Sequence, residues 1–249
     1  MDEQPQTARI WNYWLGGKDN FAVDRAVGDQ IREAFPDIVD NARASRAFLV
    51  RAVGLAAGEG IRQFLDVGTG LPTADNTHEV AQRAAPEARI VYVDFDPLVL
   101  THARALLTSS PEGATAYIDA DGRDTVRVLT AAADTLDLSR PVALIMSGLL
   151  GHVTDDDEAL TMVRAYLAAL APGSWFIALD GSHSIEHGEA EKIWNDQANP
   201  PYVLRSHAQF ARFFEGLTMV EPGVTSAPLW RPAETNPKRL DVVCGVAIK

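Results

Sequence analysis

Residues 63–73 read QFLDVGTGLPT, and this stretch decides the fold: a short apolar run ends in a carboxylate and two closely spaced glycines. Apolar runs of this length, bounded by turn residues, are typical of strands that are buried on both faces. Two glycines permit a tight turn and the close approach of a ligand to the backbone. Because Pro72 suits the first turn of a helix, we predict a strand, a ligand-binding turn and a helix in succession.

Similar apolar runs recur along the chain and alternate with stretches of helical pattern. The runs lie at 89–93, 115–118, 141–146 and 174–179, and the helical stretches include 76–85, 97–108 and 155–170. Strands that alternate with helices indicate a parallel sheet with helices on both faces. The sequence therefore predicts an α/β protein with a Rossmann-like, doubly wound sheet.

The last third of the chain departs from this alternation. Residues 206–215 predict a helix that Ser206 caps, and two further strand candidates follow at 217–221 and 240–248. With no helix between them, these two strands either pair antiparallel or lie apart, since a parallel pair needs a crossover connection. We expect a mostly parallel sheet with one reversed strand.

The N-terminal quarter has helical periodicity from residue 7 to residue 60, interrupted at Gly16-Gly17 and at Pro36. We therefore divide the chain into an N-terminal helical cap or lid, residues 1–60, and one compact ligand-binding domain, residues 61–249. The aromatic residues Trp11 and Trp14 lie beside the glycine break. They favour a lid over the site, with a helix packed on the sheet edge as the alternative.

The composition of the chain argues against several classes of function. The chain has 249 residues, and 22 basic minus 34 acidic side chains give a net charge of −12, which argues against nucleic acid as a partner. The single cysteine, Cys244, excludes an intramolecular disulfide and a cysteine-based zinc cluster. Neither a long apolar span nor a secretory leader is visible, so we expect a cytoplasmic protein without membrane association.

A second carboxylate suggests what the glycine turn binds. Asp94 ends the second predicted strand, 24 positions after Gly70, which is the spacing of a carboxylate that accepts from ribose hydroxyls. Thr73 stands where a dinucleotide fingerprint has its third glycine, and Asp66 would face a pyrophosphate with like charge. S-adenosylmethionine has no phosphate and carries two cationic groups. This cofactor therefore fits better than NAD.

The third predicted strand ends in another acidic segment, which contains Asp121, Gly122 and Asp124. The Asp121 carboxylate could accept from an adenine amino group. Alternatively, Asp121 caps a helix over 122–133, a role that aspartate fills well.

The chain resembles class I S-adenosylmethionine-dependent methyltransferases. It is similar in particular to an actinobacterial branch known as S-adenosyl methyltransferase and formerly catalogued as a domain of unknown function. The resemblance covers nearly the whole chain and rests on these segments: ARIWNYWLGGKDNF at 8–21, SRAFLVRAV at 45–53, GIRQFLDVGTGLPTADNTHEVAQ at 60–82, YVDFDP at 92–97 and LAPGSWF at 170–176.

The resemblance implies a seven-stranded sheet whose last strand is inserted antiparallel. It also implies a role for residues at the carboxyl ends of the strands. The glycine turn binds the methionine end of the cofactor, Asp94 binds the ribose, and Phe95 and the Asp121 segment contact the adenine. Residues after the fourth strand form the floor of the cofactor site. The residues so assigned, together with Thr69 within the turn, are Asp66 (through water), Gly68, Gly70, Asp94, Phe95, Asp121, Gly122, Ser147 and Gly148.

The acceptor side is less defined. Methyl transfer needs alignment of the acceptor, and it needs a base only if the nucleophile loses a proton. His152 is a candidate base, or else it packs under a helix; Asp180 and His183 form a base and its orienting partner, or else a polar turn. Arg46 either reaches the cofactor carboxylate or is solvated. We find no metal-binding motif.

The sequence thus predicts a methyltransferase that acts on a small-molecule acceptor. The alternatives are a non-catalytic module that binds S-adenosylmethionine or S-adenosylhomocysteine, and a different reaction with the same cofactor. The acceptor and the oligomeric state are not predicted.

Overall fold

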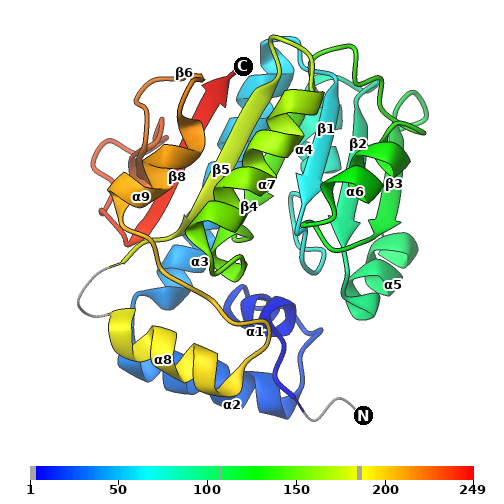
Figure 1. Ribbon diagram of the computed structural model, residues 1–249. Helices are drawn as coiled ribbons and strands as arrows, with labels where there is room; N and C mark the ends of the chain where they lie inside the picture. The colour runs from blue at the N-terminus through cyan, green and yellow to red at the C-terminus, as the bar shows by residue number, and fades with distance from the viewer. Residues whose placement is uncertain (1–3, 107, 184–186) are drawn as a thin grey trace.

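The computed structural model describes residues 4–106, 108–183 and 187–249 as an α/β fold around one mixed sheet (Figure 1). The strands are β1 Gln63–Val67, β2 Arg89–Asp94, β3 Ala114–Asp119, β4 Ala143–Ser147, β5 Trp175–Gly181, β6 Thr218–Met219, β7 Thr225–Ser226 and β8 Val242–Ile248. The α-helices are α1 Thr7–Trp14, α2 Ala22–Ala34, α3 Ile38–Gly58, α4 Thr77–Ala84, α5 Pro97–Leu106, α6 Thr125–Ala132, α7 Asp156–Ala169, α8 His187–Gln197 and α9 His207–Ala211. Short 3-10 helices are η1 Leu150–His152, η2 Arg212–Phe214 and η3 Ala227–Leu229.

The sheet has the order β3-β2-β1-β4-β5-β8-β6, with β7 paired beside β8. β1 to β5 are parallel, whereas β8 runs antiparallel to β5, β6 and β7. The predicted Rossmann-like class and the reversed strand are confirmed. The sheet has eight strands rather than seven because the two-residue strand β7 joins it, and a strand so short leaves no apolar run to detect.

Helices cover both faces of the sheet, which explains why its strands read as continuous apolar runs. One face packs against α3, α4 and η3, around Phe48, Phe64 and Trp230. The other packs against α6, α7, α9 and η2, around Val128 and Tyr166. The predicted Ser206 cap is present, because Ser206 Oγ accepts from the Gln209 backbone N–H at 3.2 Å.

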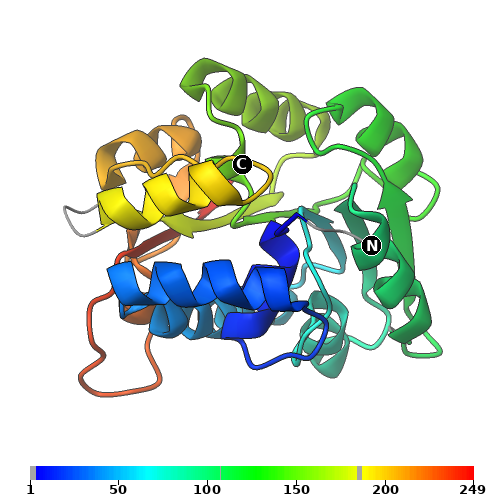
Figure 2. The ribbon, with the colours of Figure 1, turned by 90° about the horizontal axis from the view of Figure 1, so that it is seen from below.

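A separate layer of helices covers the carboxyl ends of the parallel strands. α2 and α8 lie side by side there, with α1 against them (Figures 1 and 2). Their buried residues, which include Ile10, Trp14, Ile31 and Trp194, form a hydrophobic cluster of their own. The predicted helix breaks are correct: Gly16 has φ +79° after α1, and Pro36 falls between α2 and α3.

The cap layer is not one continuous segment of sequence. Ala190 and Trp194 of α8 join the cluster, whereas Phe48 and Val53 of α3 belong to the core under the sheet. The division at residue 60 stays a prediction. Within the described residues, no helix has the length and apolarity needed to cross a membrane.

Candidate active site

The turn after β1 requires glycine for two different reasons. Gly68 has φ +75° and Gly70 has φ +64°, a region that side chains with a Cβ rarely adopt. A Cβ on Gly68 would also lie 2.8 Å from Leu149 Cδ1, whereas a Cβ on Gly70 would meet nothing within 4 Å. The first glycine is thus needed for space as well as for conformation.

Asp94 holds this turn in place. Its Oδ2 accepts a hydrogen bond from the Gly70 backbone N–H at 2.9 Å, and its Oδ1 accepts from the Asp96 N–H at 3.0 Å. Each carboxylate oxygen has a second lone pair, so both can still accept from a ligand. Burial raises the pKa of Asp94 above its ordinary value, and the two N–H donors oppose this shift.

Asp66 is a buried carboxylate beneath the turn, with 5% of its surface exposed. Its Oδ2 accepts a hydrogen bond of 2.6 Å from Thr77 Oγ1. Burial raises the pKa of Asp66 to about 6, although the Thr77 hydroxyl and the Arg46 guanidinium lower it. A buried negative charge of this kind favours a cationic ligand.

Asp66 and Gly70 line a hollow of about 300 Å³, here called the turn pocket. It is lined by Arg46, Asp66, Thr69, Gly70, Leu71, Pro72, Asn76, Thr77, Tyr92 and Tyr117. The Arg46 Nη2 donates to the Asp75 carbonyl at 2.8 Å, and its buried Nε has no hydrogen-bond partner among the described residues. One unpaired cationic donor and one buried carboxylate therefore share the same pocket, which suits an amino acid head group.

Several pocket residues were not predicted from the sequence. Tyr92 and Tyr117 occupy paired positions on β2 and β3, and their rings stack at 5.3 Å. The Tyr92 hydroxyl also accepts from the His78 N–H at 2.8 Å. Each tyrosine lies within a predicted apolar run, which indicates a strand but does not indicate a pocket.

The residues predicted to contact the adenine, Phe95 and Asp121, lie just after β2 and β3. The Phe95 side chain, at 55% exposed, is one of the few large apolar groups at the surface. Asp121 pairs with the neighbouring Arg123, whose Nε lies 3.0 Å from both carboxylate oxygens. The alternative that Asp121 caps the next helix is wrong. Asp124 does so instead, accepting from the Arg127 N–H at 3.1 Å, because α6 begins at Thr125 and not at residue 122.

Gly122 is packed closely against β1, whereas Gly148 has open space beside it. A Cβ on Gly122 would lie 2.7 Å from Val67 Cγ1, and the Gly122 carbonyl accepts from the Tyr166 hydroxyl at 2.8 Å. Gly148 follows Ser147 at the end of β4, has φ +73°, and donates its N–H to the Leu179 carbonyl at 2.8 Å.

A second hollow of about 630 Å³ lies between the cap helices and the ends of β4, β5 and β8; we call it the cap cavity. Its walls are mainly apolar and aromatic. They comprise Trp11, Trp14, Ile31, Phe35, Ile38, Asn41, Ser45, Gly148, Leu179, Gly181, Ala190, Glu191, Trp194, Tyr202, Leu204 and Val242. Apolar and aromatic walls with a few polar groups are typical of small-molecule sites.

The two hollows are close neighbours along the sheet edge. Gly148 lines the cap cavity, and the next residue, Leu149, lies against Gly68 of the glycine turn. The end of β4 therefore separates a polar pocket from an apolar one.

Asp180 does not form the predicted pair with His183. Its Oδ2 accepts from the Gly151 N–H at 2.7 Å, and its Oδ1 accepts from the Gly181 N–H at 3.1 Å and from the Tyr202 hydroxyl. His183 is exposed, and its backbone N–H donates to the Arg205 carbonyl. The pair does not form because residues 202–205 lie against the end of β5. The Tyr202 hydroxyl pairs with Asp180, and the Arg205 carbonyl accepts from the His183 N–H.

Burial raises the pKa of Asp180 to about 7, against the opposing effect of the Gly151 N–H and of Arg205. Asp180 is 4% exposed and sits behind Tyr202, a cavity residue. It therefore supports the cavity wall.

His152 is packed rather than presented to a ligand. Its Nδ1 lies 2.8 Å from the Pro201 carbonyl oxygen, and its ring meets the Tyr202 ring edge-on at 4.9 Å. Burial lowers the pKa of His152 to about 4. In the described part of the chain, it does not line either hollow.

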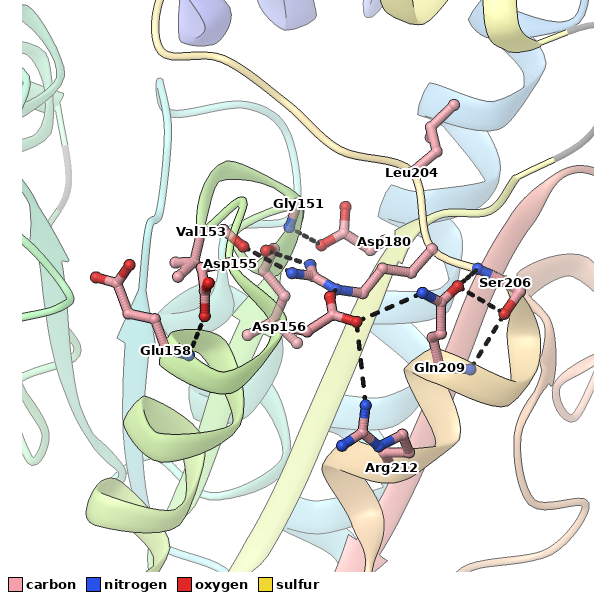
Figure 3. Close-up of polar contacts among 12 residues, drawn as sticks. Gly151, Val153, Asp155, Asp156, Glu158, Asp180, Leu204, Ser206, Gln209 and Arg212 are labelled. Carbon is pink, nitrogen blue, oxygen red and sulfur yellow. Dashed lines mark hydrogen bonds and ion pairs between the residues drawn. The ribbon is translucent and has the colours of Figure 1, made fainter.

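Arg205 is the main structural residue that sequence reasoning missed. Its buried guanidinium donates to the Leu150 and Val153 carbonyls at 2.6 and 2.7 Å and pairs with Asp156 at 2.8 Å. Figure 3 shows Asp180 beside Gly151, at one end of the turn that contains Gly151 and Val153, and Asp156 at the other end, where α7 begins. This turn, which follows Gly148, is thereby fixed from two sides.

Among the described residues, no group of three or more His, Cys, Asp or Glu side chains is placed to hold a metal ion.

An open sheet with a reversed strand beside β5, a glycine turn and acidic strand ends define the class of fold, which is Rossmann-like and is shared with solved methyltransferases. The sequence profile of the S-adenosyl methyltransferase family matches residues 1–249, and the chain belongs to this family. It is an S-adenosylmethionine-dependent methyltransferase, and S-adenosylmethionine is its cofactor.

Solved structures agree with this assignment. A DUF574 family protein from Streptomyces avermitilis MA-4680 is 42% identical, with a TM-score of 0.94 over 99% of this chain and 98% of that chain. A candidate methyltransferase from Thermobifida fusca YX is 39% identical, with a TM-score of 0.91 over 99% and 95%. Magnesium protoporphyrin IX methyltransferase from Synechocystis PCC 6803, solved with bound cofactor, is 12% identical and shares the fold with a TM-score of 0.56 over 96% and 89%. The chain matches no curated protein.

Proposed function

We propose that the chain methylates a small-molecule acceptor that binds in the cap cavity, while the turn pocket and the adjoining strand ends hold S-adenosylmethionine. The observation that carries this proposal is the juxtaposition of the two hollows. The residues at the end of β4 line the apolar cavity with Gly148 and contact the glycine turn with Leu149. A cofactor bound at the glycine turn would therefore lie beside an acceptor bound in the cap cavity.

The turn pocket suits the charges of the cofactor. Asp66 offers a carboxylate for its ammonium group, and Arg46 offers an unpaired N–H for its carboxylate. Asp94 retains lone pairs for ribose hydroxyls, and the exposed Phe95 ring offers a face for the adenine. We assign cofactor binding to Arg46, Asp66, Gly68, Thr69, Gly70, Asp94, Phe95, Asp121, Gly122, Ser147 and Gly148.

The chain's own contribution to the reaction is alignment. When bound, the cofactor supplies a methyl group that its sulfonium already activates. The cap helices enclose the acceptor and exclude water, and the rigid turn after β4 fixes the distance between the two sites. Tyr202, held by Asp180, forms part of the wall on the acceptor side. We assign Asp180 a positioning role and propose no base role for His152 or His183.

Cofactor binding is tested by calorimetric titration with S-adenosylmethionine and S-adenosylhomocysteine, with NADH as the control ligand. We expect the first two to bind, and Asp94→Ala to lose this binding because the ribose loses its acceptor and the turn loses its anchor. Binding of NADH, or unchanged affinity in Asp94→Ala, contradicts the assigned cofactor site.

The acceptor site is tested by filling the cap cavity. Ala190 lines it and is 6% exposed, so Ala190→Leu occupies the space of an acceptor. Against a panel of small phenols, aromatic amines and carboxylic acids, we expect S-adenosylhomocysteine formation and a gain of one CH₂ in the acceptor. The variant should lose this turnover and keep its affinity for S-adenosylhomocysteine. Ala131→Leu, on α6 across the sheet, is the matched control. Undiminished turnover in Ala190→Leu contradicts the proposed site.

A further inference from the structure

Asn41 places one unpaired hydrogen-bond acceptor in the apolar wall of the cap cavity. It lies near the start of α3, is 3% exposed, and lines the cavity. Its Nδ2 donates to the Asp241 carbonyl at 3.3 Å. Its Oδ1 is buried and has no partner among the residues that the structure describes.

The orientation of this amide follows from its neighbour. If the amide were reversed, Oδ1 would face the Asp241 carbonyl oxygen, and two acceptors would meet without a proton between them. The atom left without a partner is therefore the oxygen, and the group that completes it must be a donor.

No donor among the described residues reaches that oxygen. Ser45 Oγ donates to the Asn41 backbone carbonyl at 2.7 Å. The indole N–H groups of Trp14 and Trp194 donate to the carbonyls of Gly28 and Pro200, each at 3.2 Å. The Tyr202 hydroxyl is engaged by Asp180.

A buried acceptor without a partner is unfavourable, and a ligand donor is one group that can complete it. The rest of the cavity offers aromatic surface, from Trp11, Trp14, Phe35 and Trp194. Flat apolar molecules pack favourably against such walls.

We propose that Asn41 determines acceptor specificity: the cap cavity takes an aromatic molecule with one N–H or O–H group, which donates to Asn41 Oδ1. This deepens the proposed function and rests on it. A site built to pair with a donor discriminates strongly against an analogue that lacks it, because its own acceptor is then left unpaired.

The test compares indole with benzofuran, two flat bicycles of nearly equal shape, of which only indole has an N–H donor. Both are titrated by calorimetry, with and without saturating S-adenosylhomocysteine. For the wild type we expect indole to bind at least about tenfold more tightly, in line with the penalty for an unpaired buried acceptor.

Asn41→Leu keeps the side-chain size and removes the acceptor. We expect it to lose the preference for indole and to keep its affinity for benzofuran. The Asp241 carbonyl still accepts from the Ser182 N–H at 3.1 Å, so the substitution leaves no new unpaired group there. Ala131→Leu, on α6 and outside the cavity lining, is the control and should keep the preference.

Equal affinities in the wild type, no binding of indole, or an unchanged preference in Asn41→Leu overturns the specificity proposal. Equal affinities would mean that water, and not the ligand, donates a hydrogen bond to Asn41 Oδ1. Binding of indole and benzofuran is also measured without S-adenosylhomocysteine, so the two proposals can fail separately. If the cofactor assignment is wrong, S-adenosylhomocysteine does not bind, but the preference for indole remains.

Discussion

Arg205 Nε lies 2.8 Å from Asp156 Oδ1, and this ion pair joins the segment after α8 to the first turn of α7. The Arg205 side chain is 4% exposed and that of Asp156 is 36% exposed. The same guanidinium also holds two carbonyls of the turn after β4. One buried cation therefore connects three segments at the edge of the cap cavity.

Replacing this guanidinium should destabilise the protein strongly. We expect Arg205→Met to lower the free energy of unfolding by about 3 kcal/mol, since two buried carbonyls and a carboxylate lose their donor. Arg205→Lys should recover less than half, because one ammonium group cannot reach three acceptors in the same fork geometry. Chemical denaturation measures both.

The matched control is Arg164→Met, whose exposed pair with Glu215 spans 3.2 Å. It should change stability by less than about 0.5 kcal/mol. An Arg205→Met variant as stable as this control would contradict the role given to Arg205.

The affinity for S-adenosylhomocysteine should depend on pH through Asp66. Its pKa is about 6 in the folded protein, so the carboxylate is ionised above this pH and protonated below it. An ionised Asp66 attracts the ligand ammonium, which itself stays protonated below about pH 7.7. The dissociation constant should therefore rise by up to about tenfold per pH unit below pH 6.

Asp66→Asn is the control, and its affinity should be weaker and nearly flat between pH 5 and 7. Calorimetry over this range separates the two proteins. Tighter binding by the wild type at low pH, or an equal slope in the variant, would sink the assignment of Asp66 to the ammonium group.

The two glycines of the turn should respond unequally to alanine. Both substitutions impose a positive φ on a residue with a Cβ, at a cost of about 1–2 kcal/mol. Gly68→Ala also meets Leu149, whereas Gly70→Ala meets nothing. We expect Gly68→Ala to cost at least about 1 kcal/mol more, measured by thermal or chemical unfolding.

A double-mutant cycle checks the cause. Leu149→Ala should partly relieve Gly68→Ala and should have no such effect on Gly70→Ala. Equal costs at the two glycines would show that space at Leu149 is not the limiting factor.

The cap depends on a buried ion pair between Arg9 and Asp24, whose side chains are 1% and 0% exposed and 2.9 Å apart. Asp24 Oδ2 also accepts from the Phe21 N–H at 2.8 Å. Asp24→Asn removes the charge that balances Arg9, so we expect a loss of about 3 kcal/mol and faster proteolysis within residues 1–35. Asp40→Asn, at an exposed pair with Arg43, is the control and should change little.

The lid hypothesis makes a separate prediction. Because Ile10 and Trp14 are buried in the cap cluster, deletion of residues 1–20 should reduce turnover and cofactor affinity. A truncated protein with normal values of both would rule out a lid role.

The sequence was most informative where function and local structure coincide. The apolar run at 63–67 matches β1, and the runs at 89–93 and 174–179 match β2 and β5 within two residues. Asp94 was found because a carboxylate at a strand end, a fixed distance after a glycine turn, has a local signature. Its hydrogen bond to Gly70 N confirms that the two are neighbours.

Contacts between distant segments left no such signature. Asn41 meets Asp241 across 200 positions, and Arg205 meets Leu150 across 55. Asp180 was predicted beside His183 because they are close in sequence, but Tyr202 fills that place in space. Such partners follow from how the cap and the sheet pack together, which periodicity alone does not encode.

The position of β8 imposes an order of assembly. β8 lies between β5 and β6, although the ribosome makes it after both β6 and β7. Until Val242–Ile248 has emerged, β6 has no neighbour to pair with, and the cap cavity lacks the Val242 side of its wall. A nascent chain can therefore form its glycine turn before β8 has been made, whereas β6 and the wall of the cap cavity are completed only when β8 pairs with β5.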